Sequence, residues 1–178
     1  WKDEAAQRGL SNYPSTAECM ASYISQKNID LVTSHGIFSE SEFRARHAIQ
    51  LETYCKTINI EALTMVDMAM HQILPAALHY SRDLCDGVKS KKELGLSCRA
   101  ESALLHRLSD SCDRLYESIT ALQEILSHVP GETAAAADYY RNTVVPVMGT
   151  LREYADILEA VTDKSYWPYP TYSDLLFY

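Results

Sequence analysis

Two carboxylate–histidine pairs in this sequence have a spacing suited to acid–base chemistry. Asp67 with His71, and Glu124 with His128, are carboxylate–histidine pairs four positions apart. On a helix this spacing places both side chains on one face, where a carboxylate can orient an imidazole for acid–base work or metal binding. The same spacing also forms ordinary surface pairs worth about 0.2–0.5 kcal/mol. We interpret both as surface pairs, because the histidines are scattered singly: His35, His47, His71, His79, His106 and His128.

Motifs of known catalytic sites are missing from the sequence. It contains no Glu-x-x-His pairs of a di-iron bundle, no His-Glu-x-x-His, no P-loop, no Gly-x-Gly-x-x-Gly and no Gly-x-Ser-x-Gly. His71 and His79 share a predicted helix but lie about 12 Å apart along its axis, too far to share one metal ion. The sequence therefore predicts no catalytic, cofactor-binding or metal-ligating residue in this chain.

The cysteines are more consistent with packing than with disulfides or metal. Their number is odd, and no two form a Cys-x-x-Cys pair. This usage is typical of reduced core residues in a cytoplasmic protein. The residues are Cys19, Cys55, Cys85, Cys98 and Cys112.

Composition and charge narrow the class of partner. The chain has 178 residues, 47% of them hydrophobic and 22% charged, as in ordinary globular proteins. A formal net charge of −8 disfavours nucleic acid and anionic membranes as main partners, since both require a basic face. No stretch approaches the ~20 apolar residues of a membrane span.

Nearly all of the sequence between Ser15 and Asp163 has helical patterning. Ser15 with Glu18, and Ser39 with Glu42, are capping-box patterns that predict helix starts. Gly36, a basic loop from Gly87 to Gly95, and Pro130-Gly131 are predicted breaks. The predicted helices span residues 15–36, 39–86, 97–128 and 132–162.

The last two predicted helices each carry one apolar seam with alternating spacings of three and four, typical of helices packed side by side. One seam comprises Leu105, Leu108, Cys112, Leu115, Ile119, Leu122, Leu126 and Val129. The other comprises Ala137, Tyr140, Val144, Val147, Leu151, Tyr154, Leu158 and Val161.

The predicted helix over 39–86 carries two overlapping seams, which make residues 58–70 apolar on most of the circumference. We expect such a stretch to be buried on all sides. Pro75 and Pro146 lie inside helical patterns and should kink or locally open them. Asn59, Glu61 and Asp67 either occupy a narrow exposed strip or hydrogen-bond to another domain or to the aromatic tail.

The predicted fold class is all-α: a long antiparallel three-helix bundle with an extra short N-terminal helix and an extended aromatic and proline-rich C-terminal tail. Residues 1–14 are expected to be a linker from a missing upstream region, residues 15–163 the helical bundle and residues 164–178 the tail. The tail is too apolar to be free in water, so its side chains need a groove, for which the helix around 58–70 is a candidate. The candidate interface residues are Trp167, Pro168, Tyr169, Pro170, Tyr172, Leu175, Leu176 and Phe177.

Several stretches together resemble the C-terminal helical region of type III glutamine synthetases. They are Y-C-K-T-I-N-I-E-A-L-T-M-V-D-M-A at 54–69, I-L-P-A at 73–76 and the ending Y-W-P-Y-P-T-Y-S-D-L-L-F. Y-P-S-T at 13–16 and H-G-I-F-S-E at 35–40 extend the resemblance over essentially the whole chain.

The resemblance implies a parent enzyme, a glutamate–ammonia ligase that forms glutamine with ATP and a divalent metal, Mg or Mn, in ring-shaped homo-oligomers. It implies a bacterial, cytoplasmic protein of nitrogen metabolism. The family's catalytic motifs would precede Trp1, and none of them matches this sequence. The expected partners are therefore the catalytic domain of the same polypeptide and neighbouring subunits.

Two functions stay open at this point. The first is a non-catalytic structural and assembly domain of such an enzyme. The alternative is a stand-alone helical adaptor that binds a partner helix in a groove.

Overall fold

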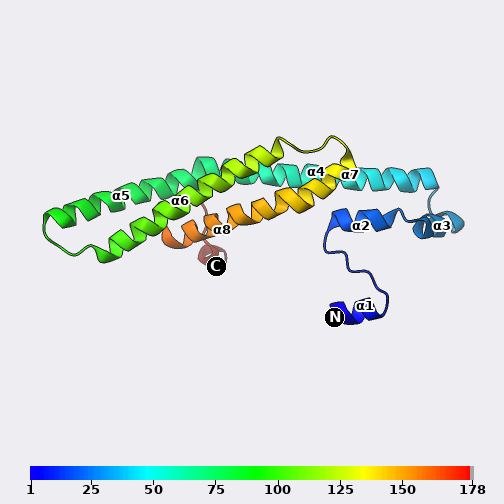
Figure 1. Ribbon diagram of the computed structural model, residues 1–178, viewed down its shortest axis with the longest axis horizontal. Coiled ribbons are helices and arrows are strands. Elements are labelled where there is room, and N and C mark those ends of the chain that lie inside the picture. The colour runs from blue at the N-terminus through cyan, green and yellow to red at the C-terminus, as the bar shows by residue number, and fades with distance from the viewer. Residues whose placement is uncertain (177–178) are drawn as a thin grey trace. The chain divides into compact units, whose positions relative to one another are not determined.

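The computed structural model describes residues 1–176, and within that range the regular structure is entirely helical, which confirms the all-α class (Figure 1). The helices are α1 (Lys2–Gln7), α2 (Thr16–Tyr23), α3 (Gln26–Ser34), α4 (Glu40–Met68), η1 (Ala69–Ile73), α5 (Leu74–Glu93), α6 (Arg99–Leu126), α7 (Thr133–Tyr139), η2 (Tyr140–Val144), α8 (Val145–Val161) and α9 (Tyr172–Leu176).

The two internal prolines open the helices locally without ending them. Each is preceded by a single π-helical turn, η1 before Pro75 and η2 before Pro146. In these turns the Leu74 N–H donates to the Ala69 carbonyl and the Val145 N–H donates to the Tyr140 carbonyl, five residues back in each case. Because proline has no N–H to continue the regular ladder, the wider turn lets each helix pass it. The prediction for both prolines is confirmed.

The start of α4 is fixed by a reciprocal capping box. The Glu42 N–H donates to Ser39 Oγ at 3.3 Å, and the Ser39 N–H donates to Glu42 Oε2 at 2.9 Å. At Ser15 the box is only half formed, because the Glu18 carboxylate pairs with Arg141 instead of turning back to the Ser15 N–H.

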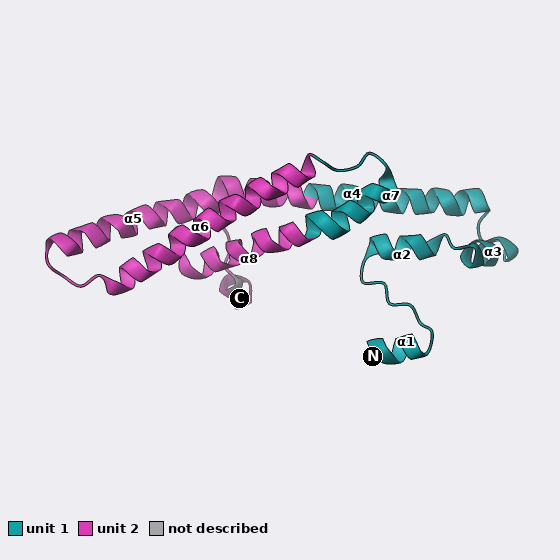
Figure 2. Ribbon diagram, viewed as in Figure 1, with its two compact units in different colours: residues 1–60, 128–145 teal, residues 61–127, 146–178 magenta. Residues whose placement is uncertain are grey.

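The chain divides into two compact units (Figure 2). The first comprises residues 1–60 and 128–145, and the second comprises residues 61–127 and 146–178. Nothing tests the predicted division into linker, bundle and tail, although residues 2–7 of the expected linker form α1.

The first unit packs α2 against α4 and α7. Ala17, Met20, Leu51 and Ala137 form its apolar cluster, with Tyr23, Tyr54 and Cys55 packed against them. The ring of Tyr23 stacks on Phe43 with centroids 4.5 Å apart. These contacts join residues from distant parts of the sequence.

In the second unit α5 and α6 form an antiparallel hairpin (Figure 1). The turn between them closes at Gly95, whose φ of +70° is the left-handed geometry favoured for glycine. The Leu96 N–H donates to the Lys91 carbonyl and the Gly95 N–H to the Lys92 carbonyl, which together make a Schellman cap. The predicted seam of α6 is buried along most of its length, with Leu108, Cys112, Leu115, Ile119 and Leu122 at most 3% exposed.

Four expectations about the elements are wrong. The loop predicted from Gly87 is shorter, because α5 continues to Glu93 and includes Gly87 as an ordinary helical residue. The first predicted helix is divided into α2 and α3 around Ser25. The tail is not extended throughout, since residues 172–176 form α9. The stretch 58–70 is not buried on all sides, because Ile60 is 63% and Leu63 is 52% exposed.

The antiparallel three-helix arrangement itself stays a prediction. Among the described residues, no helix is both long enough and apolar enough to cross a membrane.

Candidate functional site

The C-terminal tail begins with a turn that is held to α5. After α8 ends at Val161, the Asp163 carboxylate accepts a hydrogen bond from the Ser165 N–H at 2.8 Å and another from the Ser165 hydroxyl. The ring of Tyr166 then packs beside Tyr80, with centroids 5.2 Å apart, and its hydroxyl donates to the Asp83 carboxylate. This hydrogen bond raises the pKa of Tyr166 and lowers the pKa of Asp83.

The end of the tail is organised around the Asp174 carboxylate. It accepts hydrogen bonds from the Thr171 N–H at 3.0 Å and from the Thr171 hydroxyl at 2.9 Å, while its other oxygen pairs with Lys164. In return the Asp174 N–H donates to Thr171 Oγ1 at 3.3 Å. Thr171 and Asp174 thus form a capping box that starts α9 directly after the prolines. Lys164 first, and then Thr171, lower the pKa of Asp174 to about 2.

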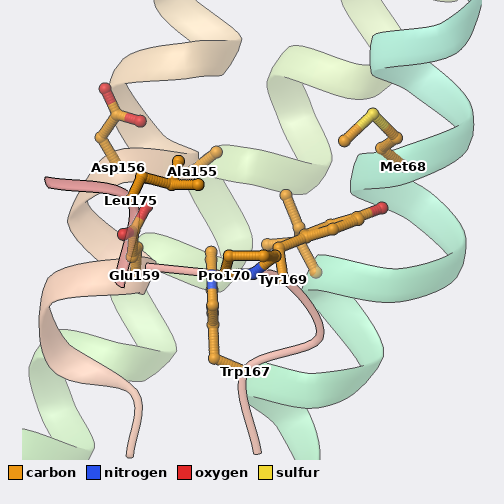
Figure 3. Close-up of a pocket in the computed structure, with 9 residues that line it drawn as sticks. Met68, Ala155, Asp156, Glu159, Trp167, Tyr169, Pro170 and Leu175 are labelled. Atoms are coloured by element: carbon orange, nitrogen blue, oxygen red, sulfur yellow. The ribbon is translucent and has the colours of Figure 1, made fainter. Parts of the chain in front are cut away.

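Between the two anchored points the tail forms one wall of an apolar cavity of about 240 Å³ (Figure 3). Trp167, Tyr169, Pro170 and Leu175 line it from the tail. The other walls come from the end of α4, from η1 and from α8, and they comprise Met68, Ile73, Ala155, Asp156 and Glu159.

Tyr169 is the most confined side chain of this wall. Its hydroxyl is fully covered and has no hydrogen-bond partner within the described part of the chain. Figure 3 places this oxygen on the Met68 side of the cavity. Burial, with a smaller effect of the Asp67 charge, raises the pKa of Tyr169. Apolar packing therefore holds the ring in place, without help from a polar contact.

The candidate interface residues occupy different environments. Trp167 and Tyr169 are partly buried in the cavity wall, whereas Pro168 and Pro170 are exposed. Leu175 and Leu176 of α9 are 66% and 73% exposed. The Tyr172 side chain and Phe177 lie outside what the structure describes. An interface role for these residues stays a prediction.

Four polar residues that anchor the tail were not singled out from the sequence. The Thr171-x-x-Asp174 spacing is itself a capping-box signal, so α9 could have been predicted from it. Asp83 and Lys164 carried no such signal, because each meets its partner only in the folded chain.

Three polar residues lie in the apolar stretch of α4 over residues 58–70, and the structure places them in different surroundings. Glu61 and Asp67 are exposed, and Asp67 Oδ1 lies 2.9 Å from Nδ1 of His71, which is the surface pair expected from the sequence. Asn59 is partly buried and accepts a hydrogen bond from the Tyr140 hydroxyl at 3.1 Å. This partner of Asn59 lies in η2, which is neither another domain nor the tail.

The cysteines and carboxylates do not gather into a ligand set. The five cysteines are free thiols, and burial raises the pKa of Cys112 to about 11. Within residues 1–176, no group of three or more His, Cys, Asp or Glu side chains is placed to hold a metal ion. The described residues therefore do not fit a site for the Mg or Mn that the resemblance implies for a parent enzyme.

The known proteins to which we find this chain similar are glutamine synthetases. The family described as glutamine synthetase C-terminal domain matches residues 1–92. A glutamine synthetase of Butyrivibrio fibrisolvens is 39% identical over 181 residues, which cover 99% of this chain and 26% of that protein. A type-3 glutamine synthetase of Dictyostelium discoideum is 31% identical, with 99% of this chain and 25% of that protein covered. A glutamine synthetase of Bacteroides fragilis is 30% identical over the same shares of the two chains.

The extent of these matches can be compared with the length of each relative and with the two compact units. This chain spans about a quarter of the length of these relatives. The alignments also extend across both compact units, so the similarity is not confined to one of them. The chain belongs to the glutamine synthetase C-terminal domain family.

Proposed function

We propose that this chain is the non-catalytic structural and assembly domain of a type III glutamine synthetase. The catalytic domain of the same polypeptide, located in the cytoplasm, would ligate ammonia to glutamate with ATP and Mg or Mn. The helical chain would contact that domain and neighbouring subunits of a homo-oligomer. The relatives' names and the share of their length that this chain spans support this division of roles.

The observation that carries the proposal is the position of two leucines on α9. Leu175 and Leu176 are 66% and 73% exposed, on a short helix held by the Asp174 capping box and the Lys164 pair. Full burial of a leucine side chain contributes about 1.5–3 kcal/mol. Covering both leucines with a partner surface would therefore favour association.

Further apolar residues are exposed along α4. Ile49 and Ile60 in the first unit, and Leu63 in the second, are between 52% and 63% exposed. They supply additional contact area for a partner within the same enzyme.

The experiment compares one substitution with a matched control in the full-length enzyme. Leu175→Asp places a charge in the proposed contact, whereas Ser173→Asp adds the same charge at another exposed position of α9. We expect Leu175→Asp to reduce the mass of the assembly in sedimentation velocity and to reduce ligase activity with it. Ser173→Asp should retain both.

The 178-residue chain alone should form no glutamine from glutamate, ammonia, ATP and Mg²⁺ or Mn²⁺. Metal- and ATP-dependent glutamine formation by this chain would overturn the non-catalytic role. An unchanged assembly in both Asp variants would overturn the role of α9 as a contact.

A further inference from the structure

The lining of the tail cavity combines apolar side chains with two carboxylates. Trp167, Tyr169 and Pro170 provide flat apolar surfaces contributed by the tail. Asp156 and Glu159 come from α8, three positions apart and so on neighbouring turns of one helix face. In Figure 3 the Asp156 carboxylate is drawn away from Trp167.

The charges around the cavity are predominantly negative. Its described lining includes two carboxylates and no lysine, arginine or histidine. A third carboxylate, Asp67, is close enough to Tyr169 for its negative charge to raise the pKa of that tyrosine. Arg152 is the neighbouring cation on α8, but it meets Asp156 at 3.5 Å with both side chains largely exposed. Exposed pairs of this kind contribute about 1 kcal/mol or less, so a ligand cation can compete with Arg152.

The size of the cavity restricts what fits. At about 240 Å³ it is smaller than the sites of roughly 300–1,000 Å³ that hold drug-sized ligands. Apolar and aromatic walls with a few polar groups are the usual composition of a small-molecule site. Aromatic faces also attract cations, so a positively charged ligand is compatible with the aromatic walls as well as with the carboxylates.

We propose that the tail cavity binds a small organic cation, a primary ammonium group on a short aryl or alkyl stem. The stem lies against Trp167, Tyr169 and Pro170, and the ammonium group donates hydrogen bonds to Asp156 and Glu159. The site is formed by residues of the second unit alone, and binding to it is measured by Trp167 emission instead of by the mass of the assembly.

Trp167 provides a direct reporter of binding. The chain contains two tryptophans, and Trp1 is 82% exposed and is not part of the cavity. Replacing it in a Trp1→Phe variant therefore leaves Trp167 as the single indole. Titration of this variant with phenethylammonium should shift the Trp167 emission, with a Kd on the order of 1 mM.

The neutral isostere separates the contribution of charge from that of apolar contact. 2-Phenylethanol has the same ring and stem with a hydroxyl in place of the ammonium group. It should bind at least about fivefold more weakly, since fivefold corresponds to roughly 1 kcal/mol. Raising the ionic strength should narrow this difference by screening the carboxylates.

Substitutions locate the site. Asp156→Asn combined with Glu159→Gln should weaken phenethylammonium binding at least about fivefold and leave 2-phenylethanol binding unchanged. Asp113→Asn with Glu117→Gln makes the same charge change on exposed positions of α6 outside the cavity and should alter neither affinity. Circular dichroism at matched concentrations checks that both double variants remain helical.

Three results would overturn the proposal. The first is equal affinity for the ammonium and the alcohol, which would identify a purely apolar cavity. The second is equal weakening by the two double variants, which would indicate a general charge effect. The third is an unchanged Trp167 emission up to about 20 mM phenethylammonium, well above the expected Kd of about 1 mM.

Discussion

The Tyr140 hydroxyl donates a hydrogen bond to Oδ1 of Asn59 over 3.1 Å, joining η2 to α4 across 81 positions of sequence. Tyr140 is 5% exposed, and burial raises its pKa. This bond satisfies a polar residue within the apolar part of α4. It also lies at the π-helical turn before Pro146, where the helix is locally widened.

Two tyrosine-to-phenylalanine substitutions should therefore have different effects. Tyr140→Phe leaves the partly buried Asn59 amide without this partner and should lower the free energy of unfolding by about 1 kcal/mol. Tyr169→Phe removes a covered hydroxyl that has no partner among the described residues and should be neutral or stabilising by up to about 1 kcal/mol. Urea unfolding followed by circular dichroism measures both, and a larger loss for Tyr169→Phe would contradict the contrast.

Two glycines of α5 and its turn allow a second matched comparison. Gly95 has a φ of +70°, so Gly95→Ala should destabilise the chain by about 1–2 kcal/mol. Gly87 is helical, and a Cβ built there meets no atom within 4 Å. Gly87→Ala should stabilise the chain by about 0.5–1 kcal/mol, because alanine is the better helix former. Thermal unfolding should thus shift in opposite directions, and a shift in the same direction would contradict the assigned end of α5.

Attachment of the tail should depend on pH through Asp174. Its pKa is lowered from 3.8 to about 2 in the folded chain, so its ionised form is favoured there. The stabilisation is therefore complete above about pH 4 and is lost as the pH falls toward 2. Trp167 emission should report release of the tail over this interval in the Trp1→Phe chain.

Asp174→Asn provides the control for that titration. It should weaken the tail's attachment at neutral pH and remove the Trp167 transition between pH 4 and 2. A transition that persists unchanged in the Asn variant would show that other carboxylates are responsible.

The apolar positions of α6 and α4 should differ in their effect on stability. Leu115 is completely buried, so Leu115→Ala should cost about 2–5 kcal/mol. Leu63 is 52% exposed, so Leu63→Ala in the same chain should cost less than about 1 kcal/mol. Chemical denaturation measures both. A cost above 2 kcal/mol at Leu63 would instead support burial on all sides of residues 58–70.

The sequence by itself determined the helical class and the buried face of α6. Its alternating spacing of three and four follows from the period of the helix, which places Leu108, Leu115 and Leu122 on one side whatever they pack against. The local opening of the helices before Pro75 and Pro146 was also predictable, because the missing backbone N–H of a proline affects only the turn of helix next to it.

Only the tertiary structure decided which apolar residues of α4 are covered. Ile60 and Leu63 have the same apolar character as buried residues nearby, yet they remain exposed because no described segment covers them. Local patterns show that a face is apolar, but burial depends on segments that are distant in the sequence.

In the tail, too, some features follow from the sequence and others only from tertiary packing. Its aromatic and proline content predicted that it needs a covering surface, and Thr171 with Asp174 already encoded the start of α9. Pairing of Tyr166 with Asp83, and the meeting of Trp167 with α8 in one cavity, required the folded chain. Such contacts are set by chain path and packing, which sequence spacing alone does not specify.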